Sequence, residues 1–221
     1  MNFGKAFTYI FDDPDWLSKL LGPVLLSLIP IVGTLTFSGY ILDLIRNVSR
    51  NVQHPLPDLD IGGQLGRGFR WFLVQVVYAL PFMLLALVML PFFISLGNAS
   101  DNNSAAALPV IILVLVGALM AVYGLLLSLI LPVAQANFAN KDSFASGFNF
   151  GELFRMVGNN FGAWLFVLLG FIIAGFIAPL GSFLVLIGAV ITSGYAQLMV
   201  SHLQGQAYTL SQSKAGSIQS Y

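Results

Sequence analysis

The chain has 221 residues, of which 57% are hydrophobic and 8% are Asp, Glu, Lys or Arg, and its formal net charge is zero. Soluble domains carry about 25% charged residues, so a water-soluble fold of this chain would expose large apolar patches, whereas lipid accepts such a surface. The absence of cysteine excludes disulfides, thiol catalysis, iron–sulfur clusters and cysteine-containing zinc sites. The zero net charge gives no reason to expect a nucleic acid partner.

The N-terminal segment, residues 1–16, holds acids and aromatics but no long apolar run. It therefore does not look like a cleavable signal peptide, and we expect the first hydrophobic segment to serve as an uncleaved signal. The composition as a whole predicts an all-α, polytopic helical membrane bundle.

Four apolar stretches follow in chain order, and a helix needs about 20 apolar residues to cross the hydrocarbon core. The second stretch (69–96) and the third (108–133) each fit a single span. The fourth (161–200) is too long for one span and carries a Pro-Gly break at 178–181, which predicts a hairpin.

The first stretch, 16–45, is broken by Pro30 and Gly33 and fits either one long tilted span or a hairpin bending at 30–33. Cytoplasmic loops of membrane proteins hold the Lys and Arg residues. With hairpins in the first and fourth stretches, all nine basic residues fall inside, whereas a single first span would place Lys5 and Lys19 outside. We therefore predict about six segments, arranged as three hairpins, with both termini cytoplasmic. Whether 16–45 crosses twice or is re-entrant is left open.

Two polar segments complete this topology. Residues 97–107 contain no Lys or Arg and are predicted to form the exterior loop. Residues 205–221 are rich in Ser and Gln and poor in apolar residues, which predicts a disordered tail.

The chain also repeats itself, which is typical of an array of similar units. The triplet Asn2-Phe3-Gly4 matches Asn149-Phe150-Gly151. The triplet Ser38-Gly39-Tyr40 matches Ser193-Gly194-Tyr195, and at the same spacing before these two triplets lie Gly33 and Gly188, respectively. We predict a single transmembrane domain over 1–204 with about three repeats, at 2–50, 60–139 and 149–204. Each repeat would be a short amphipathic segment followed by a helical hairpin.

The three amphipathic segments carry apolar residues at helical spacing. Their stripes are Phe3, Phe7 and Phe11; Ile61, Leu65, Phe69 and Phe72; and Phe150, Leu153, Phe154 and Val157. Such helices can lie in the membrane interface with their rings toward the acyl chains. Two interpretations stay open: connectors that cap the bundle from inside, or segments that shape or sense the bilayer.

Several polar motifs resemble those of a known family. They are FDDPDW at 11–16, IPIVG at 29–33, GY at 39–40, RNV at 46–48 and PLP at 55–57. This pattern resembles the domain of unknown function 4013 family of uncharacterised prokaryotic membrane proteins, best over residues 3–85 and extending to about 205. The resemblance implies a multi-pass protein of the prokaryotic plasma membrane, and it brings no known activity and no functional residues.

No ionisable residue falls at mid-bilayer, where transporters and proton relays usually place one. Asp43, Arg46, Glu152 and His202 all fall near predicted cytoplasmic ends. The two histidines, His54 and His202, are isolated and make a weak metal site. We therefore predict no catalytic residue, no metal site and no cofactor. The acidic cluster Asp12, Asp13 and Asp15 is better interpreted as a turn and helix N-cap than as a cation site.

Two sets of residues are candidates for contacts of other kinds. Residues for lipid headgroups or the membrane interface are Arg46, Arg50, Arg67, Arg70, Trp16, Trp71 and Trp164. Small residues for close helix packing are Gly33, Gly39, Gly158, Gly162, Gly188 and Gly194. In a second interpretation, the arginines only set the orientation of the protein in the membrane, since cytoplasmic loops hold the basic residues.

The function that these observations favour is a non-enzymatic scaffold or accessory subunit of the membrane. Its partners would be the lipid bilayer and a membrane protein or a second copy of the chain. The alternative is a channel or uncoupled small-molecule transporter with a pore between the repeats.

Overall fold

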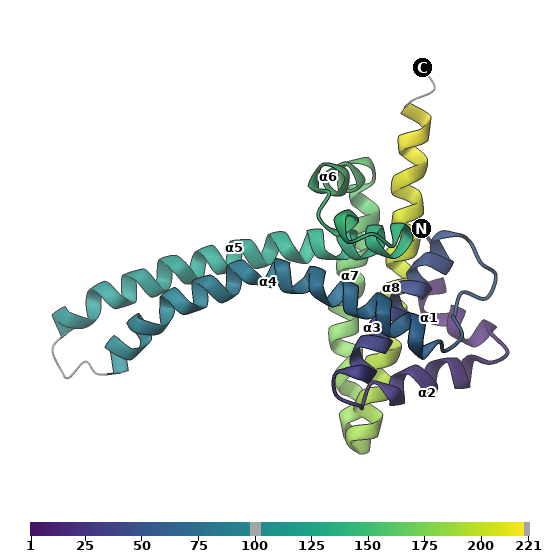
Figure 1. Ribbon diagram of the computed structural model, residues 1–221, viewed down its shortest axis with the longest axis horizontal. Helices are drawn as coiled ribbons and strands as arrows, with labels where there is room; N and C mark the ends of the chain where they lie inside the picture. The colour runs from purple at the N-terminus through teal and green to yellow at the C-terminus, as the bar shows by residue number, and fades with distance from the viewer. Residues whose placement is uncertain (98–102, 219–221) are drawn as a thin grey trace. The chain divides into compact units, whose positions relative to one another are not determined.

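The computed structural model describes residues 1–97 and 103–218, and within these ranges it contains eight α-helices, three short 3-10 segments and no strand (Figure 1). The predicted all-α fold class is confirmed. Residues 98–102 of the predicted exterior loop lie outside the described residues, and the rest of its second half, from Asn103, belongs to α5.

The elements in chain order are α1 (Lys5–Thr8), η1 (Tyr9–Asp12), α2 (Trp16–Leu26), α3 (Val32–Ser49), α4 (Ile61–Gly97), α5 (Asn103–Lys141), η2 (Phe144–Gly147), α6 (Phe150–Asn159), α7 (Phe161–Ile177), η3 (Ala178–Leu184) and α8 (Val185–Ile218). They form two compact units: unit 1 comprises residues 1–74 and 130–221, and unit 2 comprises residues 75–129. The long helices α4 and α5 therefore contribute to both units.

Three helices are long and apolar enough to cross a membrane, at 61–97, 107–141 and 161–182. They correspond to the second and third predicted stretches and to the first half of the fourth. The first stretch does not form one long helix, because the chain turns between α2 and α3, where Pro30 is followed by Ile31 at a φ of 66°. With 11 residues, α2 is about 16 Å long, shorter than the ~30 Å hydrocarbon core.

The core of unit 1 forms around α8. Leu198, Met199 and Leu203 of α8 are fully buried, and α3 and α7 pack along the helix. At Gly205 the helices come close enough that an added Cβ would lie 2.6 Å from Cβ of Val48 on α3. The apolar side of α8 therefore faces other helices of the same unit.

The C-terminal part of α8 differs from the prediction of a disordered tail over 205–221. The helix continues to Ile218, and Ala207 and Ser211 are fully buried. Ser211 accepts a hydrogen bond of 3.0 Å from Nε1 of Trp164. This end of α8 is ordered because its buried polar groups find partners on α7, which hydropathy does not reveal. Residues 219–221 lie outside the described residues.

Helices α3 and α4 cross in unit 1 at two glycines that face each other's backbone. A methyl group on Gly39 would collide with the carbonyl of Gln64, and one on Gly68 would collide with the carbonyl of Leu35. Such close approach is possible because glycine has no side chain. The predicted packing role of Gly39 thus has a partner, Gly68, that the sequence did not single out.

The other predicted packing glycines divide into two groups. Gly33 lies against the backbone of Leu26, Gly194 against Val24, and the carbonyl of Gly188 against Gly181. By contrast, an added Cβ at Gly158 or Gly162 would meet nothing within 4 Å. Gly158 and Gly162 therefore lie on open faces and make no close helix contact within the described part of unit 1, so their packing role stays a prediction.

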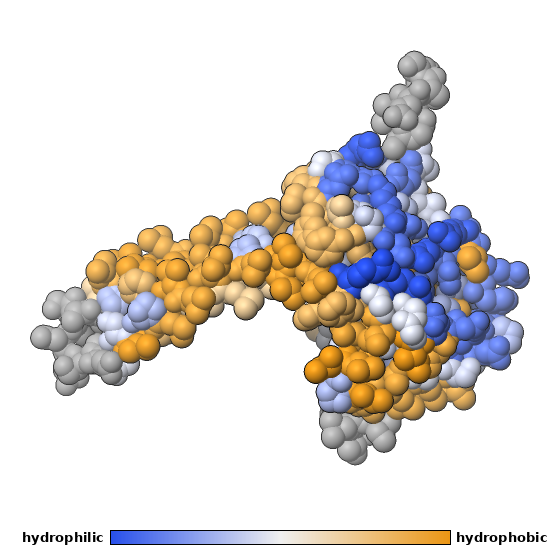
Figure 2. Space-filling model, viewed as in Figure 1, coloured by the Kyte–Doolittle hydropathy of each residue, from blue (hydrophilic) through white to orange (hydrophobic). Residues whose placement is uncertain are grey.

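Unit 2 consists of the second half of α4 and the first half of α5. Tyr123 donates a hydrogen bond of 2.9 Å to the carbonyl of Tyr78, and its ring lies 5.0 Å from that of Phe82. α4 runs through Pro81 without interruption. Two helices cannot bury their whole surfaces in each other, so unit 2 shows an almost entirely apolar face (Figure 2).

The crossing of α3 and α4 generates a prediction about two neighbouring glycines. Gly68→Ala should destabilise the protein by about 1–3 kcal/mol, because the methyl group overpacks a backbone contact. Gly66→Ala, in the same helix with nothing within 4 Å of its added Cβ, should be neutral or stabilising by up to ~1 kcal/mol. The midpoint of thermal unfolding in mild detergent measures both. Equal effects of the two substitutions would contradict the crossing.

Candidate functional site

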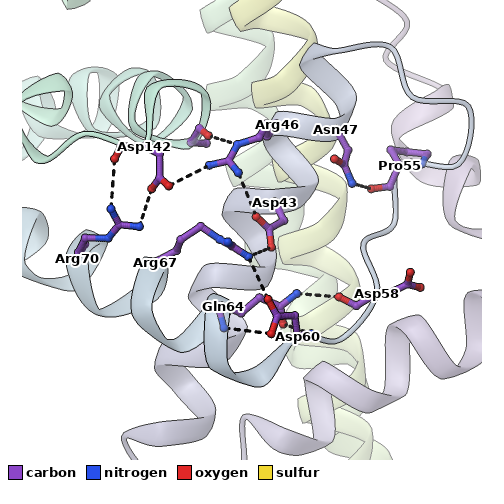
Figure 3. Close-up of polar contacts among 12 residues, drawn as sticks. Asp43, Arg46, Asn47, Pro55, Asp58, Asp60, Gln64, Arg67, Arg70 and Asp142 are labelled. Carbon is purple, nitrogen blue, oxygen red and sulfur yellow. Dashed lines mark hydrogen bonds and ion pairs between the residues drawn. The ribbon is translucent and has the colours of Figure 1, made fainter.

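Every Asp, Glu, Lys and Arg whose side chain the structure describes lies in unit 1. The densest group lies where the C-terminal half of α3, the segment 55–60, the start of α4 and the end of α5 meet (Figure 3). We call this group the charged cluster; its members are Asp43, Arg46, Asn47, Asp58, Asp60, Gln64, Arg67, Arg70 and Asp142.

Asp43 is the centre of the charged cluster. Its Oδ2 lies 2.6 Å from Nη2 of Arg67 on α4, and its Oδ1 lies 3.7 Å from Nη1 of Arg46 one turn along α3. The side chains of Asp43 and Arg67 are 15% and 20% exposed. The pair lies beside the glycine crossing, so it connects α3 and α4 where their backbones come closest.

Asp142, directly after α5, extends the charged cluster to a third helix. Its carboxylate lies 2.9 Å from Nη2 of Arg70 and 4.0 Å from Nη2 of Arg46. Nε of Arg46 also donates a hydrogen bond of 2.6 Å to the carbonyl of Ala139. Arg46 therefore connects α3 to the end of α5, and Arg70 connects α4 to it.

The Pro-rich segment 55–60 is held by amide side chains. Asn47 donates a hydrogen bond of 3.0 Å to the carbonyl of Pro55. The fully buried Gln64 donates one of 2.9 Å to the carbonyl of Asp58 and accepts one of 3.2 Å from the N–H of Asp60. Because these bonds satisfy backbone groups that no helix satisfies, the segment takes a fixed course.

A hollow of about 490 Å³ lies among these groups. Its charged lining consists of the cations Lys19, Arg46, Arg50 and Arg67 and the carboxylates Asp43, Asp58 and Asp60. Within the described residues, Arg50 makes no ion pair, whereas the other three cations do. The charged cluster mostly neutralises itself, and no three His, Asp or Glu side chains among the described residues form a metal-binding group.

The structure separates the residues predicted to contact headgroups. Arg50 and Arg70 reach the surface, whereas Arg46 and Arg67 are mostly covered and engaged with carboxylates. Trp16 is half-buried and packs edge-on against Phe11.

The other two tryptophans are core residues. Trp71 is 2% exposed and lies against Phe138, and Trp164 is 1% exposed. Headgroup contact by Trp71 and Trp164 is therefore a wrong prediction. Their positions near span ends suit an aromatic belt, but their rings fill gaps between helices of unit 1.

The acidic cluster before α2 forms a turn, as predicted, but its members have different roles. Asp15 occupies the N-cap position without a side-chain capping bond. Asp13 accepts a hydrogen bond of 2.9 Å from the N–H of Asp15 and lies 3.0 Å from Nζ of Lys19. Burial acts to raise the pKa of Asp13, but the Asp15 N–H and the Lys19 ammonium outweigh it and hold the pKa below its ordinary value.

A second hollow, of about 430 Å³, lies between the N-terminal segment, the end of α3 and α8. His202 lines it, is 5% exposed and stacks on the ring of Tyr9 at 4.2 Å. Burial, and secondarily the charge of Lys5, lower the pKa of His202 to about 4. Apart from the i, i+4 spacing of His202 and Gln206, no sequence pattern predicts this site, because Tyr9 and Lys5 lie almost 200 positions away along the chain.

Comparison with known proteins identifies the family. The family model described as "Protein of unknown function (DUF4013)" matches residues 23–196, so the chain belongs to this family. No curated protein matches the chain. No solved structure matches it.

The charged cluster predicts different effects for two nearby arginines. Arg67→Gln should lower stability by about 1–3 kcal/mol, because it leaves the half-buried Asp43 without its closest partner. Arg50→Gln, which removes a cation without an ion pair among the described residues, should stay within ~0.5 kcal/mol. Thermal unfolding in detergent measures both, and a double-mutant cycle with Asp43→Asn should show coupling for Arg67 alone.

His202 predicts a pH dependence of stability. The pKa of His202 in the folded chain, about 4, lies below the ordinary histidine pKa of 6.5, so the unfolded chain takes up the proton first as the pH falls. The contribution of the neutral His202 to the free energy of unfolding is therefore complete above pH ~6.5. As the pH falls from 6.5 to 4, this contribution is lost, by up to roughly 3 kcal/mol. The unfolding midpoint of His202→Gln should fall less steeply over this range. His54→Gln, at an exposed histidine, should keep the parent slope.

Proposed function

We propose that this member of the DUF4013 family is a multi-pass membrane protein that acts as a non-enzymatic scaffold or accessory subunit. Its contacts would be the lipid bilayer and a membrane partner or a second copy of the chain. The observation that carries this proposal is the separation of surfaces: the candidate spans present uncovered apolar side chains, while the charges gather in unit 1 and pair with one another.

The apolar surface needs a cover that the chain does not supply. Among the 18 consecutive residues of α5 with the highest mean hydropathy, none is buried. Among the corresponding 18 residues of α4, 11% are buried. Leu84 is 62% exposed and Leu125 is 73% exposed. Because burying one such side chain is worth roughly 1.5–3 kcal/mol, a membrane or another apolar helix is the environment that these helices require.

The chemistry of unit 1 favours a structural role over catalysis. In the charged cluster Asp43 and Asp142 are both engaged by arginines. A carboxylate held by a permanent cation is a poor general base, and the described lining of the hollow includes no Ser, Thr, Tyr or Cys side chain that it could activate. The charged cluster is therefore better suited to holding three helix ends together, with Arg50 free for an anionic headgroup.

Equivalent contacts support the proposed internal repeat. Asn2 and Asn149 each accept a hydrogen bond in their side chain from the N–H three residues later. Tyr40 and Tyr195 each donate one of 2.7 Å to a backbone carbonyl of the N-terminal segment or α2. The two asparagine contacts are therefore equivalent by position, as expected of a duplicated unit. The tyrosines share only the kind of acceptor, because Tyr40 binds Lys19 in its own repeat and Tyr195 binds Phe7 in the N-terminal repeat.

The proposed topology has six segments with both termini in the cytoplasm. The hairpins would be α2–α3, α4–α5 and α7–α8, with the short N-terminal segment and α6 at the interface. In α6, Leu153 and Val157 are buried while Phe150 and Phe154 are exposed. This split favours a helix that packs on unit 1 by one side and offers two aromatic rings to the membrane surface.

Cysteine labelling tests this topology, because the chain has no native cysteine. With a membrane-impermeant maleimide on intact cells, Ser100→Cys should be labelled, whereas Gln53→Cys should react after permeabilisation alone. Leu28→Cys decides how the first hairpin is placed: labelling from outside indicates crossing, and protection indicates a re-entrant loop. The cysteine-free parent is the control. Labelling of Gln53→Cys from outside would overturn the topology.

Reconstitution into liposomes separates the scaffold from the alternative, a channel or uncoupled transporter. We expect the flux of small ions and neutral solutes to stay at the level of protein-free vesicles. Solute-specific flux that Gly68→Ala abolishes and Gly66→Ala preserves would favour the alternative and contradict the scaffold.

A further inference from the structure

The hollow beside His202 has three walls from distant parts of the chain. The N-terminal segment contributes Lys5, Tyr9 and Asp12, the end of α3 and the following loop contribute residues 48–55, and α8 contributes residues 202–210. Its volume of about 430 Å³ lies within the range of small-molecule sites, roughly 300–1,000 Å³. It is separate from the charged cluster, since neither hollow shares a lining residue with the other.

The hydrogen bonds of Gln206 fix the state of the histidine. Oε1 of Gln206 accepts a bond of 2.7 Å from the N–H of Asn2, and Nε2 donates one of 3.2 Å to the carbonyl of Asn2. The second hydrogen of this amide therefore points to Nδ1 of His202, 2.9 Å away. Nδ1 must accept, so the proton of the neutral ring is on Nε2.

This leaves Nε2–H of His202 as a fixed donor without a partner among the described residues. The residue is 5% exposed and lines the hollow. Nε2 is not one of the fully buried side-chain atoms without a partner in the described part of the chain, so it is accessible from the hollow. The stacked Tyr9 does not accept from it, because Tyr9 gives its own hydroxyl to the carbonyl of Leu198, 3.0 Å away. The unused donor points to a ligand that accepts a hydrogen bond.

We propose that this hollow binds a small organic carboxylate, whose oxygens meet Nε2–H of His202 and the ammonium of Lys5 and whose apolar body lies on Val48, Val52 and Leu210.

The charges of the lining select the class of ligand. Lys5 makes no ion pair with a described residue, and the end of α3 and α8 contribute no charged side chain to the hollow. The α-ammonium of Met1 and Lys5 against the carboxylate of Asp12 leave the lining with one net positive charge, which together with the uncharged donor matches a single negative charge. Asp12, which lines the same hollow, repels a second negative charge on the ligand, and this repulsion disfavours phosphate. The apolar lining favours a carboxylate with a hydrocarbon body over acetate.

The site predicts coupling between ligand and proton. Burial, and then Lys5, hold the pKa of His202 low, and a bound carboxylate beside Nε2 would raise it by favouring the charged ring. The charged groups among the residues that line the hollow beside His202 are the α-ammonium of Met1, Lys5 and Asp12, all from the N-terminal segment. A pKa of His202 that rises on binding is therefore a signature that simple partition of the acid into lipid would not produce.

The test uses the full chain in lipid nanodiscs with ¹⁵N-labelled histidine, since its two histidines give one signal from the hollow and one control, the exposed His54. Hexanoate should shift the His202 signals saturably and raise its pKa, while His54 stays unchanged. Hexanol, which has the same hydrocarbon body without the charge, and inorganic phosphate should bind at least about tenfold more weakly.

Variants localise the effect. Lys5→Gln should weaken hexanoate binding about fivefold, and His202→Phe, which retains an aromatic ring against Tyr9, should weaken it about tenfold or more. Arg50→Gln, which removes a surface cation outside this hollow, should leave it unchanged. Lys5 is exposed, so its variant tests the site even where His202→Phe does not fold.

Four results would overturn the proposal. They are a linear, unsaturable response to hexanoate, an equal response to hexanol, tighter binding of phosphate than of hexanoate, and unchanged binding in Lys5→Gln. None of these results bears on the membrane topology, which the cysteine labelling tests separately.

Discussion

The close crossing of α3 and α4 is the contact on which the charged cluster depends. Gly39 and Gly68 let the two backbones touch, and this approach brings Arg67 of α4 to 2.6 Å from Asp43 of α3. Larger residues at either glycine would separate the helices and leave a half-buried carboxylate without its partner, at a cost of about 1–3 kcal/mol. The glycine packing of α3 against α4 and the ion pair between Asp43 and Arg67 therefore depend on the same helix crossing.

The same constraint explains why the arginines are not free to serve as a lipid-binding patch. Each of Arg46, Arg67 and Arg70 joins two segments of unit 1 through a carboxylate or a backbone carbonyl. Arg50 stands apart and remains available for a headgroup. The scaffold role that we propose would use this connected polar end, since lipid packing alone gives little orientation to a helix.

The N-terminal segment and the end of α8 form a second polar region in unit 1. Gln206 binds both backbone groups of Asn2 and orients His202, and Ser211 satisfies the indole of Trp164. A segment with the composition of a disordered tail is therefore a helix whose buried polar groups are paired. Asn2, His202 and Gln206, which the first set of bonds connects, also line the hollow that we assign to a carboxylate.

The sequence by itself determined the all-α class, the three long apolar helices, the break near Pro30 and the family, because hydropathy and proline act over short distances along the chain. The tertiary structure alone decided which arginines are engaged, that Trp71 and Trp164 are core residues, that Gly68 is the partner of Gly39, and that α8 extends to Ile218. Each of these facts depends on a contact between residues far apart in sequence. One sequence carries no record of such contacts, since the same side chain suits a membrane interface or a protein core.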